Sequence, residues 1–207
     1  MAPVYETLSR ICNEINDRMF VPVKMDVGNI CLLIYRKKGY NGYCYKDENW
    51  KVNGDGAREI ALTDGAILGG INEIMTTLAH ELIHAYHGVA NVKGCSGKYH
   101  NKKFASACDK IGLQYKIVPK HGVITPSQEH PIFTSILSSL TDSERDIINN
   151  VSVLIDLGSP SKSKTKNLVV HICPVCGAKA RATETTHLLC GDCSEPEKLV
   201  SMEVSEE

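Results

Sequence analysis

The chain has its most regular pattern at residues 71–87, which read INEIMTTLAHELIHAYH. Apolar side chains recur there at the i, i+3, i+4, i+7 spacing of an amphipathic helix. They are Ile71, Ile74, Met75, Leu78, Ala79, Leu82, Ile83 and Tyr86. Two glycines precede the stretch and Gly88 follows it, so we expect a helix that begins near Ile71, ends near His87 and packs its apolar face on the core.

Three histidines of this helix lie away from the apolar face. At about 100° per residue, His80, His84 and His87 fall on its opposite side. His80 and His84 are four residues apart, so their rings lie one above the other and can bind one ion. Zinc suits imidazole nitrogen, and Glu81 is placed to take a proton from water on that zinc. The alternative is a solvated helix face that carries histidines by chance.

A third zinc ligand has to come from outside the pair. One known arrangement needs Gly and His three and six residues after His84, where this chain has His87 and Ala90. Another needs a downstream glutamate, and none occurs from Ala85 through Gln128. The remaining candidates are His87, Cys95, His100, Cys108 and Asp109. We favour His100, because the preceding loop is long enough to fold back over the helix, and we keep His87 as the alternative.

The rest of the first 157 residues predicts a mixed α+β fold. Residues 3–20 have helical periodicity, and short β-type runs separated by Lys-Gly, Asn-Gly and Asp-Gly pairs fill residues 23–63. Such pairs favour hairpins, so we expect a small antiparallel sheet packed on the HExxH helix. Further helices are expected at residues 101–112, between Asn101 as N-cap and Gly112, and within residues 128–157.

Two CxxC pairs lie near the C-terminus. Cys173-Pro-Val-Cys176 and Cys190-Gly-Asp-Cys193 are separated by thirteen residues, a spacing typical of a zinc ribbon. Four thiolates fill a tetrahedral shell, so this second zinc is predicted to be structural. The segment is too small to fold without its metal. Unligated cysteines or disulfides are the alternative.

We therefore expect a domain at residues 1–157, a polar basic linker at 158–167 and a zinc ribbon at 168–207. The helical extension at residues 113–157 has no evident role. Nine cysteines, an odd and uneven set, argue against a disulfide framework. The sequence has neither a long apolar run nor a signal peptide, so we expect a cytoplasmic protein without a membrane partner.

The net charge of -1 gives no overall attraction to nucleic acid. Residues 85–127 nevertheless hold seven lysines against one acid, Asp109. DNA contact through Lys93, Lys98, Lys102, Lys103 and the ribbon is one reading. An ordinary solvated surface is the other.

The sequence resembles the SprT-like zinc metallopeptidases. The similarity rests on His80-Glu81-Leu82-Ile83-His84-Ala85-Tyr86 and on His100-Asn101-Lys102-Lys103-Phe104, where Asn101 replaces a usual glycine. It covers about residues 3–112 and the ribbon. It implies His80, His84 and His100 as zinc ligands, Glu81 as catalytic base, and peptide hydrolysis, sometimes on proteins attached to DNA.

The predicted function is that of a zinc metalloendopeptidase with one catalytic and one structural Zn²⁺, acting on protein or peptide substrates. The alternatives are a non-catalytic nucleic-acid-binding protein with structural zinc sites and a hydrolase of a non-peptide bond. The donor that stabilises the oxyanion stays open among Tyr86, Tyr99 and His87. An extended substrate is expected to pair with an edge strand at Glu59–Thr63.

Overall fold

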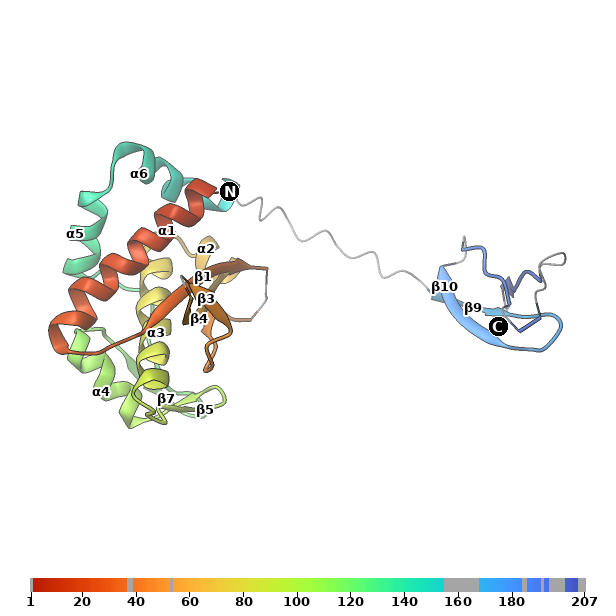
Figure 1. The fold of residues 1–207 in the computed structure, drawn as a ribbon, viewed down its shortest axis with the longest axis horizontal. Helices are drawn as coiled ribbons and strands as arrows, with labels where there is room; N and C mark the ends of the chain where they lie inside the picture. Colours follow the sequence, from red (N-terminus) through yellow and green to blue (C-terminus); the bar gives the residue numbers. More distant parts are fainter. Residues whose placement is uncertain are drawn as a thin grey trace. The chain divides into compact units, whose positions relative to one another are not determined.

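The computed structural model describes residues 2–36, 39–52, 54–154, 168–183, 186–190, 192–193 and 200–204. The chain divides into two compact units, Met1–Leu157 and Gly158–Glu207 (Figure 1). The expected linker at 158–167 lies outside the described residues. The two units are described separately below.

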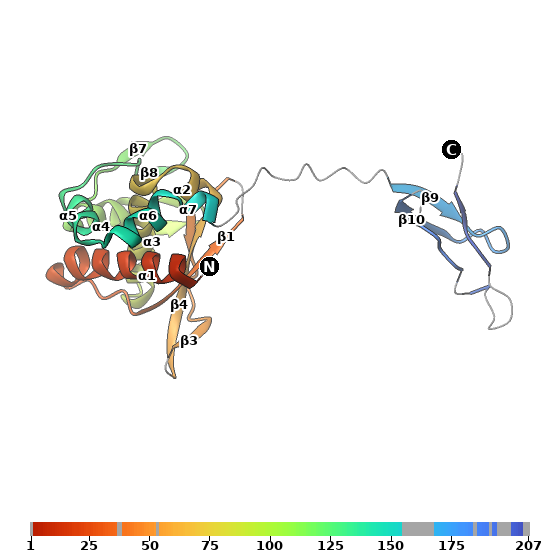
Figure 2. The same ribbon diagram turned by 90° about the horizontal axis from the view of Figure 1, so that it is seen from above.

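The first unit is built on two long helices. α1 (Ala2–Ile15) continues into a π-helical turn, η1 (Asn16–Phe20), and a 3-10 turn, η2 (Val21–Val23). α3 (Ile71–Val89) lies beside α1 (Figure 2). Both helices bury apolar faces in one core.

α3 runs two residues beyond the expected end at His87, so Gly88 lies inside the helix and Ala90, not Gly88, is its C-cap. Gly88 is needed for a different reason. A Cβ there would come within 2.8 Å of the Arg58 Nε atom, so the arginine side chain packs directly on the helix backbone.

The main sheet consists of β1 (Asn29–Tyr35), β2 (Gly42–Cys44), β3 (Trp50–Val52) and β4 (Asp55–Thr63). β2 and β3 pair antiparallel with β4, as expected, but β1 pairs with β4 in parallel. The sheet is therefore mixed, and the expectation of a wholly antiparallel sheet is wrong. β1 and β2 therefore do not form a hairpin across the Gly-containing pair that precedes β2. A parallel pair needs a crossover connection, and the chain between β1 and β4 is long enough for one.

A second, smaller sheet has the order β5-β6-β8-β7. Its strands are β5 (Cys95–Ser96), β6 (Tyr99–His100), β7 (Lys116–Val118) and β8 (Gly122–Ile124). The remaining helices are α2 (Asp64–Leu68), α4 (Lys102–Ile111), α5 (Pro131–Ser139), α6 (Asp142–Asn149) and α7 (Val151–Leu154). α4 confirms both predicted ends, because the Asn101 side chain accepts from the Lys103 N–H and Gly112 is left-handed at φ 72°.

The second unit is a three-stranded antiparallel sheet of order β10-β9-β11. Its strands are β9 (Leu168–Ile172), β10 (Lys179–Thr183) and β11 (Glu203–Val204). With the two units together, the molecule is a mixed α+β protein with small sheets. Among the described residues, no helix is both long and apolar enough to span a bilayer.

Candidate metal centre

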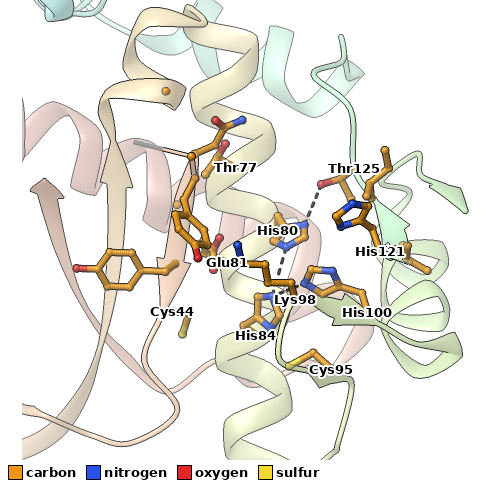
Figure 3. Close-up of a pocket in the computed structure, with 18 of the residues that line it drawn as sticks. Cys44, Thr77, His80, Glu81, His84, Cys95, Lys98, His100, His121 and Thr125 are labelled. Atoms are coloured by element: carbon orange, nitrogen blue, oxygen red, sulfur yellow. Dashed lines mark hydrogen bonds between the residues drawn. The ribbon is translucent and has the colours of Figure 1, made fainter. Parts of the chain in front are cut away.

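Three histidines of the first unit bring their ring nitrogens together. The His84 Nε2 atom lies 3.3 Å from His80 Nε2 and 3.0 Å from His100 Nε2 (Figure 3). A tetrahedral shell with zinc–nitrogen bonds of about 2.0–2.1 Å has edges of about 3.3 Å. The three imidazoles therefore form a group that could hold a metal ion, with one side left for another ligand.

His100 reaches this group through the second sheet. β6 lies beside β8 with His100 opposite Gly122, and the His100 N–H donates to the His121 carbonyl at 3.1 Å. Gly122 has φ 72°, and a Cβ there would lie 2.0 Å from the His100 carbonyl oxygen. Only glycine permits this close approach. β8 belongs to residues 113–157, a segment to which the sequence assigned no role.

The same strand orients two of the three rings. The His80 Nδ1 atom lies 2.9 Å from the Thr125 hydroxyl, directly after β8. His100 bonds to the backbone of Val123. When Nδ1 of a histidine donates to such a partner, its Nε2 lone pair is left for a metal. No sequence signal pointed to Thr125, because it is far along the chain from the helix and follows no spacing.

The rings pack on a buried aromatic side chain. Phe104 is fully buried, with its centroid 4.7 Å from His80, 5.0 Å from His84 and 4.4 Å from His100. Burial lowers the pKa of His84 to about 3, with smaller contributions from His100 and His87. Burial likewise lowers the pKa of His80 and that of His100. All three imidazoles are thus neutral at pH 7, the form that binds metals.

Glu81 lies beside the histidines in a cavity of about 680 Å³. Its side chain is 5% exposed, and burial raises its pKa to about 8. Gly42 of β2 lies directly against it, since a Cβ at that position would be 3.1 Å from the Glu81 Cγ atom and 2.9 Å from the Ala61 carbonyl oxygen. A carboxyl group with a pKa near neutrality can both accept and return a proton.

The side chains expected to stabilise the oxyanion are not the ones that line this cavity. Its polar side chains include Tyr40, Lys98, His121 and Thr125, whereas Tyr86, Tyr99 and His87 are not among the lining residues. The Lys98 ammonium lies 4.7 Å above the Tyr40 ring, so residues from two separate loops meet at the cavity.

The other candidates for the third ligand do not join the group of nitrogens. His87 is buried and its ring lies 5.9 Å from Phe104, beneath Gly94. Cys95 lines the cavity, but the group that could hold an ion contains neither it nor Cys108 nor Asp109.

The segment expected to pair with an extended substrate is not at the edge of the sheet. The segment Glu59–Thr63 is interior, because β1 pairs on one side of β4 and β2 on the other. The expectation that this segment forms an edge is wrong. β2 lines the cavity instead.

The four ribbon cysteines form a second group that could hold a metal ion. Their sulfurs lie within 4.8 Å of one another, and Cys176 Sγ is 3.6 Å from Cys190 Sγ, too far for a disulfide. The Cys176 backbone N–H is the main cause that lowers the pKa of Cys173 to about 7. The neighbouring thiol of Cys176 raises the pKa of Cys193 to about 12. Four thiolates at this distance repel one another, and a bound dication removes that repulsion.

The lysines that could contact DNA are on the surface. Lys93, Lys98, Lys102 and Lys103 are all exposed. Comparison of the chain with family models, with curated proteins and with solved structures finds no match.

Proposed function

We propose that this protein is a zinc-dependent peptidase of the SprT-like kind, with His80, His84 and His100 as the ligands of the catalytic zinc. One observation carries the proposal: three neutral imidazoles converge beside a buried glutamate in an open cavity. The four-cysteine group of the second unit is proposed to hold a structural zinc.

Each residue has a distinct role in this proposal. His80, His84 and His100 would hold the zinc ion, which would supply a Lewis acid and lower the pKa of a bound water to about 7. Glu81 accepts the proton of the attacking water and delivers it to the leaving amine. Tyr40, Lys98 and His121 line the cavity and are candidates for stabilising the oxyanion.

The test compares the wild-type chain with Glu81→Gln. Both proteins are loaded with zinc, their metal content is measured, and each is incubated with an unfolded protein substrate with and without single-stranded DNA. We expect Glu81→Gln to bind zinc normally and to cleave at least about 100-fold more slowly. Faster cleavage with DNA present would identify a peptidase acting on DNA-associated proteins.

A second candidate function is nucleic-acid binding without catalysis. It is favoured by the exposed lysines at positions 93, 98, 102 and 103, of which Lys98 lines the cavity. The absence of cleavage by zinc-loaded wild type, together with retention on single-stranded DNA that is lost between ~50 and 200 mM salt, would establish it instead.

A further inference from the structure

The outer face of the main sheet carries aromatic rings around one buried carboxylate. Along β4, Ile60 and Leu62 join the core, so Glu59 points to the opposite face. The rings come from β1, from β2 and the residue after it, and from β3. We call this set the aromatic face: Tyr35, Tyr43, Tyr45, Trp50 and Glu59.

The carboxylate is held by the rings that surround it. Glu59 Oε1 accepts from the Tyr43 hydroxyl at 3.1 Å, and Oε2 accepts from the Trp50 indole N–H at 2.8 Å. Tyr43 stacks on Tyr35 at 6.0 Å and meets Tyr45 edge-on at 5.4 Å. The arrangement is therefore ordered before any ligand binds.

Glu59 is 6% exposed, yet the side chains that bond to it among the described residues are neutral. In the part of the chain that the structure describes, no ion pair includes it. The adjacent Arg58 is directed to Glu48 at 3.2 Å and to the Lys46 carbonyl at 3.1 Å. A buried carboxylate whose partners are all neutral favours the approach of a cation.

The rings above this carboxylate are open to solvent. Tyr35 is 40% exposed, Tyr45 48% and Trp50 43%. Burial raises the pKa of Tyr43, as do its hydrogen bond to Glu59 and the charge of that residue. Exposed aromatic rings whose edges contact a carboxylate attract ammonium and guanidinium ions. The charge of Glu59 disfavours phosphate, so a cation is the ligand argued for, and nucleic acid is the alternative that the test distinguishes.

We propose that the aromatic face binds a lysine or arginine side chain of a partner polypeptide. The cation lies against the tyrosine and tryptophan rings, and its charge is balanced by the Glu59 carboxylate at the edges of Tyr43 and Trp50. Trp, Tyr and Arg are the residues that most often dominate such interfaces. Because the rings are already fixed by hydrogen bonds and stacking, little ordering is needed on binding.

Trp50 is the only tryptophan of the chain, so its fluorescence reports on this surface directly. The test uses the full chain carrying Glu81→Gln, which makes it independent of peptidase activity. A tetra-arginine peptide is titrated in low salt, with a tetra-glutamate peptide as control. We expect a saturable change in Trp50 emission with the arginine peptide alone.

Two neutralising variants separate the aromatic face from general surface charge. Glu59→Gln keeps an acceptor for Trp50 and is expected to weaken binding about tenfold or more. Asp47→Asn removes the same charge from an exposed nearby residue and is expected to leave the affinity unchanged. If Glu59→Gln does not fold, Tyr45→Ser removes an exposed ring instead and is expected to weaken binding as well.

The proposal is overturned if the arginine peptide leaves the emission unchanged. It is equally overturned if Glu59→Gln, or Tyr45→Ser in its place, binds as tightly as Asp47→Asn. A response to single-stranded oligothymidine in place of the peptide would assign the surface to nucleic acid and also overturn it.

Discussion

At the scale of single residues, Thr125 has a role that no local pattern announces. Its hydroxyl lies 2.9 Å from His80 Nδ1. Thr125→Val keeps the shape and removes the acceptor, so we expect zinc to bind about 10–100-fold more weakly. Thr125→Ser keeps the hydroxyl and should bind nearly as wild type does. Competition with a chromophoric chelator measures both, and equal affinities would contradict the role.

The buried Glu81 carboxyl predicts a pH dependence of stability in the metal-free protein. Its pKa rises from 4.5 to about 8 on folding, so its ionisation in the native state is penalised. The stability of the wild type relative to Glu81→Gln is therefore highest below pH 4.5 and is lost as the pH rises to 8. Measured by urea unfolding, the free energy of unfolding of Glu81→Gln should increase relative to that of the wild type by about 1–4 kcal/mol between pH 4.5 and pH 8. The exposed Glu129→Gln should show no such trend, and a flat difference for Glu81→Gln would refute the prediction.

At the scale of elements, we predict that an extended substrate of the proposed peptidase pairs with β2, which lines the cavity. The Asn41 carbonyl and the Tyr45 N–H are hydrogen-bonded to the backbone of β4. Because backbone groups alternate in direction along an antiparallel strand, the Cys44 N–H points to the edge of β2 that faces away from β4. Cys44→Pro should therefore keep the fold and lower kcat/KM for extended peptides about tenfold, the effect of about one lost hydrogen bond. Cys44→Ala is the matched control, and equal kinetics for the two variants would exclude pairing through this group.

The start of α4 depends on Asn101. Its side chain accepts from the Lys103 N–H at 2.8 Å and donates to the Lys93 carbonyl at 2.9 Å. Asn101→Ala should lower the free energy of unfolding by about 0.5–2 kcal/mol. Asn101→Gly should cost less, since glycine is also accepted as an N-cap. Denaturant unfolding measures both variants. A lower free energy of unfolding for Asn101→Gly than for Asn101→Ala would contradict the prediction.

At the scale of the whole molecule, the two units are expected to depend on their metals separately. Cys193→Ser removes one of the four proposed zinc ligands and should unfold the second unit, which has little core of its own. The first unit has its own core and contains Trp50, so fluorescence-detected melting should be unchanged. Limited proteolysis would locate the loss of structure. Cys31→Ser, which belongs to neither metal-binding group, is the control, and a lowered melting temperature in Cys193→Ser alone would show that the units are coupled.

The sequence alone determined what depends on neighbours along the chain. Helical periodicity placed α3, and the four-residue spacing put His80 and His84 on one side of it. The caps of α4 followed from Asn101 and Gly112. These features were predictable because the geometry of one helix fixes which of its residues lie side by side.

Only the tertiary structure decided the parallel pairing of β1, the approach of His100 and not His87 to the ring nitrogens, and the position of Thr125. It also replaced the expected cavity residues with Tyr40, Lys98 and His121. Each of these depends on segments that are distant in the chain and meet through packing and strand pairing. A hairpin and a crossover can follow the same Gly-containing turn, so local spacing does not distinguish them. The tertiary structure distinguishes them, because β1 contacts α1 and pairs with β4, and both contacts join segments that are far apart in the chain.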